Sequence, residues 1–392
     1  MSLKFRPRST FTERPMRILL LLNTPLNDWL GRDLIRELKN KNPNITFFGT
    51  GGALMRHAGL SELPGLPVDL NFQALTKTSR AHVFKYFFYK KYLIQYALEK
   101  NIDAVITINS APMFLPLIKT FNKKFGLPCF HYGDIPSPRI RFAERKLLKD
   151  MRSFQEVFCF YPSQAKALQK QKVKASFLGH PLLSHFAEYI PSGESKPLNK
   201  VRKLALLPSG KERDFKKAMS VMADVATKLR THYEHLEIVL PIEGSINPRY
   251  FEPFSQLKAH YVRGEEKYLA MSQCDVALTM SGENNLPLAL FGVPMVSIKE
   301  SGITATLHRL FTEFFSQRCG VNVGIAHKYI PEISEKNKAL LHQSVKTLLE
   351  NSDMRKQQLV AFKEVRQMLQ SPDEHSVSKG AAAQIHKTLS KL

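Results

Sequence analysis

Short apolar runs alternate with longer amphipathic stretches along most of the chain. Short runs that are apolar throughout are typical of strands buried on both faces of a sheet, whereas apolar residues spaced three and four apart indicate helices. In the first half we expect strands at 16–22, 45–49, 104–109, 128–132, 157–160 and 176–179, and helices near 30–41, 80–99, 112–124, 141–152 and 163–171. This alternation predicts a mostly parallel, doubly wound sheet.

The second half repeats the pattern after a break. Residues 185–200 are rich in Pro, Gly, Ser and charge, which predicts a linker. Beyond it we expect strands at 203–208, 236–241, 259–262, 275–280 and 294–298, a long helix at about 212–232, and helices from about 333 to the end. The predicted fold is α/β with two doubly wound Rossmann-like domains, 16–190 and 200–350, a basic extension at 1–15, and C-terminal helices at 351–392 that pack back on the first domain.

The charge of the chain narrows the choice of partners. There are 57 Lys and Arg against 34 Asp and Glu, which gives a formal net charge of +23. Such an excess favours nucleic acid, an anionic membrane face or phosphorylated ligands, with a solvated basic surface as the alternative. No apolar run approaches the ~18 residues of a membrane-spanning helix. The four cysteines lack metal-ligand spacing, so we expect a reduced, cytoplasmic setting.

Three turns after expected strands can offer backbone N–H groups to an anion. The turn FGTGGA (48–53) departs from a dinucleotide-binding fingerprint at its third glycine position, so a tight turn is the alternative. Two further turns share a Ser-Gly pair and comprise Ser209, Gly210 and Lys211 in one and Ser281, Gly282, Glu283, Asn284 and Asn285 in the other. Both follow strands of the second half, where they predict a diphosphate site, against surface turns with an N-cap serine.

Residues 80–98 interleave aromatic rings with lysines. The aromatic and basic side chains singled out there are Phe84, Lys85, Phe87, Phe88, Tyr89, Lys90 and Lys91. Rings beside lysines suit an anionic lipid interface, and they also suit stacking on single-stranded nucleic acid. The alternative is a helix buried on two sides between domains.

The expected strand 104–109 ends on an amide and a hydroxyl, Asn109 and Ser110, where a ligand-handling edge would be. His180, in the run FLGHP, lies before a proline at a strand exit and is more often structural than a base. The sequence has no His-Glu-x-x-His motif and no Asp-x-Asp pair. We therefore expect neither a metal nor another cofactor.

Six runs together resemble one family, the lipid A disaccharide synthases. They are DWLGRDLIREL (28–38), FYPSQAKALQKQKVKASFLGHPLL (160–183), LALLPSGK (204–211), LEIVLP (236–241), CDVALTMSG (274–282) and VPMV (293–296). The runs fall in family order with family spacing over roughly residues 16 to 370. The resemblance implies a GT-B fold, with an acceptor and membrane side in the first domain and a UDP-sugar site in the second.

The implied reaction transfers an acylated glucosamine from UDP to an acylated glucosamine phosphate at the inner face of the cytoplasmic membrane. By position, Lys211 replaces a family arginine near the donor diphosphate, and Ser281 and Gly282 match the family's Ser-Gly. Residues 80–98 fall where the family has its membrane-associating helix. The partners expected are the UDP-linked acylated sugar, the acylated sugar phosphate lipid, an anionic membrane surface and a second copy of the chain, but no nucleic acid.

The chain also departs from the family pattern. In the loop NTPLND (23–28) only Asp28 matches, the ribose-binding acid falls on Pro287, and the catalytic aspartate falls on Asn109. An amide cannot serve as a general base. Asn109 and Asp28 are the candidate catalytic residues, and Glu13, His131 and Asp134 are alternative bases. Three hypotheses follow: an active divergent synthase, a relative with altered sugar or lipid specificity, and a weakly active or inactive homologue that binds UDP-sugar or anionic lipid.

Overall fold

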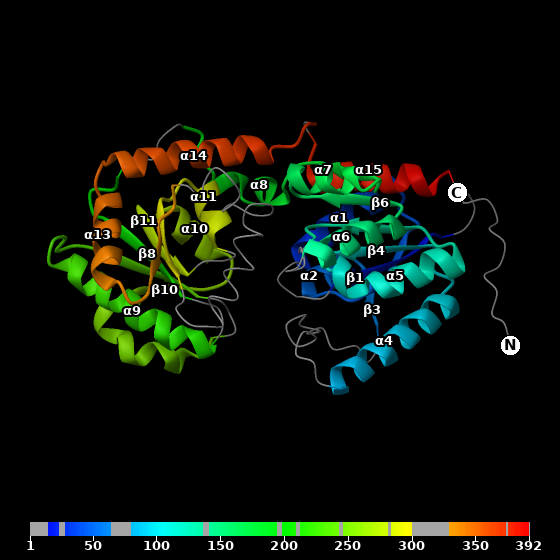
Figure 1. The fold of residues 1–392 in the computed structure, drawn as a ribbon, viewed down its shortest axis with the longest axis horizontal. Coiled ribbons are helices and arrows are strands. Elements are labelled where there is room, and N and C mark those ends of the chain that lie inside the picture. The colour runs from blue at the N-terminus through cyan, green and yellow to red at the C-terminus, as the bar shows by residue number, and fades with distance from the viewer. Residues whose placement is uncertain are drawn as a thin grey trace. The chain divides into compact units, whose positions relative to one another are not determined.

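The structure is a computed structural model, and ten ranges of the chain are described. They are 15–22, 28–63, 80–135, 141–193, 198–208, 212–242, 246–280, 284–299, 329–373 and 375–391, with side chains left out at 80–88, 111–113, 141–145, 212–214 and 248. The described residues form two compact units (Figure 1). Unit 1 lies within residues 1–181 and 371–392, and unit 2 lies within 182–370.

Unit 1 is built on a seven-stranded parallel sheet with the order β3-β2-β1-β4-β5-β6-β7. Its strands are β1 (Arg17–Leu22), β2 (Thr46–Gly49), β3 (Leu60–Glu62), β4 (Ala104–Ile108), β5 (Cys129–Tyr132), β6 (Glu156–Cys159) and β7 (Ala175–Phe177). Its helices are α1 (Asp28–Lys41), α2 (Ala53–His57), α4 (Arg80–Glu99), α5 (Ala111–Phe125), α6 (Arg141–Asp150), α7 (Pro162–Lys170) and α15 (Val377–Leu389), with a 3-10 turn, η2 (Met151–Ser153).

The core of unit 1 explains why the strands read as continuous apolar runs. Every residue of β4 is buried, because helices cover both faces of the sheet. Leu19 and Leu21 of β1 face a cluster that includes Leu93 of α4 and Phe121 of α5. In Figure 1, α15 lies beside α1, which it contacts.

Unit 2 has a six-stranded parallel sheet with the order β10-β9-β8-β11-β12-β13. Its strands are β8 (Lys203–Leu207), β9 (Glu237–Pro241), β10 (His260–Val262), β11 (Val276–Met280), β12 (Met295–Lys299) and β13 (Glu332–Ser334). Its helices are α9 (Glu212–Arg230), α10 (Glu266–Ser272), α11 (Asn285–Leu290), α13 (Lys338–Leu348) and α14 (Asp353–Leu369), with the 3-10 segments η3 (Ala187–Tyr189) and η4 (Pro248–Leu257). Helix α8 (Pro181–His185) lies where the two units meet along the chain.

The predicted fold class is confirmed, with two parallel sheets and a helical C-terminus. Two short strands, β3 and β13, were not expected from the sequence. Of the helices expected at 351–392 to pack back on the first domain, α15 contacts α1 within unit 1, whereas α14 contacts α11 within unit 2. Among the described helices, none is long and apolar enough to cross a membrane.

Candidate functional site

The strand order places one topological switch point in each sheet. It lies between β1 and β4 in unit 1 and between β8 and β11 in unit 2. Ligands of doubly wound sheets bind beyond the carboxyl ends of the strands at such points. Asn109 leaves the end of β4 in unit 1, and the two Ser-Gly turns come after β8 and β11 in unit 2. Six of the residues predicted there, Ser209, Gly210, Lys211, Ser281, Gly282 and Glu283, lie outside the described residues.

Asn109 joins the exits of two neighbouring strands. It adopts a left-handed backbone conformation, with φ of 47°, and its backbone N–H donates to the carbonyl of Tyr132 at 3.1 Å. Its side-chain Oδ1 accepts from the backbone N–H of Asp134 at 2.6 Å. Between these partners, Gly133 has a φ of 141°, and a Cβ there would lie 1.9 Å from Asn109 Oδ1. Only glycine permits this approach, so the Asn109 amide fixes where Asp134 lies.

Two other polar side chains at this edge, Ser110 and Thr50, form hydrogen bonds with the backbone of β1. Ser110 Oγ is buried and donates to the carbonyl of Leu21 at 2.8 Å. Thr50 Oγ1 accepts from the N–H of Leu22 at 2.8 Å and donates to its carbonyl at 2.6 Å. Both hydroxyls are satisfied by main-chain partners, which suits a structural role.

Asp134 is different, because part of its carboxylate has no partner. Its Oδ1 is buried and makes no hydrogen bond with any described residue. Burial disfavours the charged form and raises the pKa of Asp134 to about 7. The residue as a whole remains partly exposed. A carboxyl group that titrates near neutrality at a ligand-handling edge is a candidate for proton transfer.

His131, one residue before the end of β5, is fully buried. Its Nε2 lies 3.2 Å from the backbone carbonyl of Asp134, and its Nδ1 lies 2.8 Å from Oγ1 of Thr107. A carbonyl only accepts, so Nε2 carries the proton. Burial lowers the pKa of His131 to about 4, which leaves the ring neutral at pH 7. With both nitrogens engaged, His131 holds the backbone of Asp134, and its candidate role as the base gains no support from this geometry.

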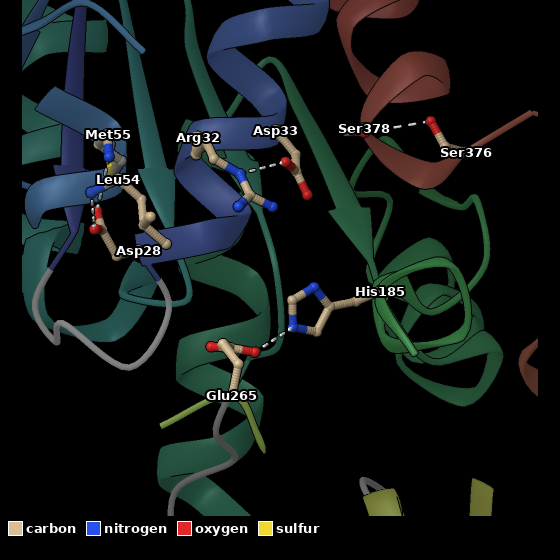
Figure 2. A network of polar contacts seen from close by, with 9 residues as sticks. All are labelled: Asp28, Arg32, Asp33, Leu54, Met55, His185, Glu265, Ser376 and Ser378. Atoms are coloured by element: carbon tan, nitrogen blue, oxygen red, sulfur yellow. Dashed lines mark hydrogen bonds and ion pairs between the residues drawn. The ribbon is translucent and has the colours of Figure 1, made fainter. Parts of the chain in front are cut away.

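Asp28 begins α1 and is buried against the glycine-rich turn at 48–53 (Figure 2). Its carboxylate accepts from the backbone N–H groups of Gly52 at 2.7 Å, Leu54 at 2.7 Å and Met55 at 3.3 Å. A Cβ at Gly52 would lie 2.5 Å from Asp28 Oδ2, so glycine is needed here too. The end of the turn and the start of α2 thus bind a carboxylate, and it is the side chain of Asp28. This geometry gives Asp28 a structural role, and its predicted catalytic role gains no support from it.

In unit 2 the described part of the predicted site begins at Asn284. Asn285 is 2% exposed and accepts through Oδ1 from Thr279 Oγ1 at 3.2 Å. Its Nδ2 is buried and has no hydrogen-bond partner among the described residues. Pro287 is buried within α11. At Asn285 and Pro287 the described part of this predicted site is buried.

The predicted membrane helix forms α4, and its second half is a surface helix. Leu93, Tyr96 and Ala97 are buried, whereas Lys91, Gln95 and Glu99 are exposed on the opposite side. Within residues 89–99, one side of α4 packs on the core of unit 1 and the other carries exposed side chains. Among the predicted membrane-binding residues, Tyr89 and Lys90 are half-buried and Lys91 is exposed. The side chains of the other four are not among those described: Phe84, Lys85, Phe87 and Phe88.

His180 takes the structural role expected of it. It is 5% exposed, and its ring contacts those of Phe160 and Tyr161 at centroid distances of 5.6 Å and 5.1 Å. Burial lowers the pKa of His180 to about 3. No group of three or more His, Cys, Asp or Glu within the described ranges is placed to hold a metal ion.

Comparison with known proteins decides the family. Residues 18–385 match the family model described as lipid-A-disaccharide synthetase. The chain belongs to this family. The predicted resemblance is thereby confirmed, and the family is one of glycosyltransferases.

Relatives of the synthetase family align along most of the chain. The lipid-A-disaccharide synthase of Alcanivorax borkumensis is 25% identical over 391 residues, which is 95% of this chain and 97% of the relative. The enzyme of that name from Hydrogenovibrio crunogenus is 27% identical over 356 residues, with coverage of 86% and 91%.

Solved structures support the GT-B-like fold of this chain. A co-structure of S. aureus MnaA with UDP aligns over 96% of this chain and 98% of its own, with a TM-score of 0.61 and 12% identity. MurG of Acinetobacter baumannii aligns over 95% and 100%, with a TM-score of 0.55 and 14% identity. At such identities the likeness concerns the fold.

Proposed function

We propose that the chain transfers an acylated glucosamine from a UDP donor to an acylated glucosamine phosphate at the cytoplasmic membrane surface. The observation that carries this proposal is the family match over residues 18–385, which spans both units. Each unit also has its switch point where the family reaction needs a ligand. The donor and the lipid acceptor are the two partners proposed.

In this proposal unit 2 binds the UDP-sugar. Ser209, Gly210, Lys211 and the turn 281–285 would hold the diphosphate, without a metal or another cofactor. The buried Nδ2 of Asn285 supplies a donor beside that turn. Some structural relatives contain the corresponding ligands: MnaA is a co-structure with UDP, and a Neisseria meningitidis UDP-GlcNAc 2-epimerase is bound to UDP-GlcNAc, with a TM-score of 0.53.

Unit 1 would bind the lipid acceptor and the inner face of the cytoplasmic membrane. The support is α4, whose exposed side carries Lys91 while its other side packs on the core. Each lysine near an anionic surface contributes about 1 kcal/mol to binding. The protein would therefore be peripheral, held by charge and by the aromatic residues of the first half of α4.

The test is UDP release from a UDP-acylglucosamine donor, with and without an acylated glucosamine phosphate acceptor. We expect release that depends on the acceptor, together with a disaccharide product identified by mass spectrometry. No acceptor-dependent release, with both substrates at millimolar concentration in detergent, would contradict the proposed transfer.

The nucleotide half of the proposal has a separate test. Lys211→Ala should weaken UDP binding by about 1–3 kcal/mol, because a charge-assisted hydrogen bond to the diphosphate is lost. Calorimetry measures this directly. Lys228→Ala is the matched control, since this exposed lysine lies in the last turn of α9, away from the carboxyl edge. Equal UDP binding by the Lys211 variant and the parent would remove Lys211 from the site.

A second candidate function has one observation in its favour. Asn109 stands where the family's catalytic aspartate is expected, and its Oδ1 is already engaged by Asp134 N–H. A homologue without a base would bind UDP-sugar or anionic lipid with little or no turnover. UDP binding or vesicle binding without UDP release would select this function.

A further inference from the structure

We propose that Asp134 is the general base of the transfer and that Asn109 is its positioning residue. The carboxylate needed at this edge has thus moved from the exit of β4 to the exit of the adjacent strand, β5. This inference rests on the proposed glycosyl transfer and deepens it by naming the proton acceptor.

Asp134 lies at the same edge of the sheet as Asn109. β4 and β5 are neighbours, with Ile108 opposite Tyr132 in the register. Asn109 and Asp134 follow these two residues by one and two positions, at the same carboxyl edge. A direct hydrogen bond from Asp134 N–H to Asn109 Oδ1, 2.6 Å long, joins them. A carboxylate at either exit therefore serves the same end of the sheet.

The backbone of Asp134 is held on both sides, while one oxygen of its carboxylate has no partner among the described residues. The backbone N–H of Asp134 is fixed by Asn109, and its backbone carbonyl is fixed by His131 Nε2. Its buried Oδ1 has no partner in the described part of the chain. A buried acceptor without a partner costs free energy, about 1–3 kcal/mol for a neutral group and more for a charged one. Such a cost is typical of functional groups.

Among the described residues, few charged side chains lie around Asp134. On β5, His131 is neutral at pH 7, because burial lowers its pKa to about 4. From β4 comes the uncharged Asn109, and from α7 the uncharged Gln164, whose Nε2 donates to the carbonyl of Ile135 at 3.4 Å. From α1, Asp33 acts on the neighbouring Tyr132 and is paired with Arg32 at 2.8 Å. Desolvation is therefore the main cause of the raised pKa of Asp134. A pKa of about 7 suits a general base that acts at neutral pH.

The step itself balances without a further reactant. The ionised carboxylate of Asp134 takes the proton of the acceptor hydroxyl, and the oxygen forms a bond to the anomeric carbon of the donor sugar. The bond from that carbon to the β-phosphate oxygen breaks, and UDP leaves with the electron pair. Asp134 then releases the proton to water.

The role of Asn109 follows from its lack of charge. A carboxylate at 109 would accept the same N–H bond, but it would add a second negative charge beside Asp134. Two carboxylates in one site raise the pKa of one of them strongly. The amide keeps the hydrogen bond without this penalty, so Asp134 can ionise near neutral pH.

The deciding experiment measures acceptor-dependent UDP release by the full chain and by Asp134→Asn. We expect kcat to fall by about 10²–10⁴-fold, the contribution of a positioned general base, with little change in KM. Asp150→Asn is the matched control and should retain parental kcat. Asp150 lies at the opposite edge of the same sheet, where α6 ends, and is paired with Lys119 at 2.6 Å.

A second variant reports on the same claim if Asp134→Asn does not fold. Asn109→Asp should shift the acidic limb of the kcat profile to higher pH, because the added carboxylate makes Asp134 harder to ionise. Parental turnover in Asp134→Asn, or an unshifted limb with increased kcat in Asn109→Asp, would overturn the inference while the transfer itself stands. Absence of turnover in the parent would overturn the proposed transfer, and the inference with it.

Discussion

Asp28 and Asp134 lie at the same edge of the unit 1 sheet, and their surroundings are opposite. Asp28 accepts hydrogen bonds from the backbone N–H groups of Gly52 in the turn at 48–53 and of Leu54 and Met55 in α2, so its carboxylate holds α2 against α1. Asp134 has a buried oxygen that no described group contacts. Chemically identical side chains thus acquire different roles from hydrogen bonding and desolvation alone, as paired carboxylates of other active sites do.

The largest effect expected is on the structural member of the pair. Asp28→Ala should lower the free energy of unfolding by about 3–4 kcal/mol, because three backbone N–H groups lose their acceptor. Asp28→Asn keeps the shape and should cost less. Urea denaturation measures both. A loss below about 1 kcal/mol in the alanine variant would show that the turn does not depend on Asp28.

The contrasting prediction is that removing the charge of Asp134 stabilises the protein. In the unfolded chain an aspartate titrates near pH ~4, whereas burial raises the pKa of folded Asp134 to about 7. Between these values the unfolded state binds fewer protons, so the stability of the parent falls as pH rises. The advantage of Asp134→Asn over the parent should therefore grow by about 2–4 kcal/mol from pH 4 to pH 8.

Denaturation curves of the two proteins at several pH values test this prediction. Asp150→Asn again serves as the control, because its partner Lys119 is on the surface and half-exposed. A stability difference between Asp134→Asn and the parent that does not change with pH would mean that the folded pKa of Asp134 is not raised.

A smaller effect should follow from the glycine that brings Asn109 and Asp134 together. Gly133→Ala places a Cβ against Asn109 Oδ1 and imposes a φ of 141° on a residue with a side chain. Such strain costs about 1–3 kcal/mol of stability. We also expect a lower kcat, because Asp134 shifts, with UDP affinity unchanged, as measured by calorimetry. Normal kcat in a folded Gly133→Ala protein would show that this approach is unimportant.

Most strands could be predicted from the sequence, because fully buried parallel strands are short apolar runs. Strands β3 and β13 were not predicted, because each is three residues long and mixes polar with apolar side chains. The turn at 48–53 was interpreted as an anion-binding loop or a plain tight turn, and Asp28 was not expected as its partner, because Asp28 lies 24 residues before Gly52. Asp134 was only one of several candidate bases, since its contact with Asn109 joins residues 25 apart. A sequence pattern does not define which side chains are buried or which residues distant in the chain come into contact.

The most direct test of the account is the pH dependence of kcat for the parent between pH 5 and pH 9. A base must be deprotonated to act, so kcat should rise with pH, pass its midpoint near the folded pKa of Asp134, about 7, and level off above it. The kcat profile of Asp134→Asn should lack this rise with pH, whereas the profile of Asp28→Asn should keep it. A flat profile, or a midpoint near pH ~4 as for an ordinary carboxyl group, would contradict the assignment of Asp134 as the general base.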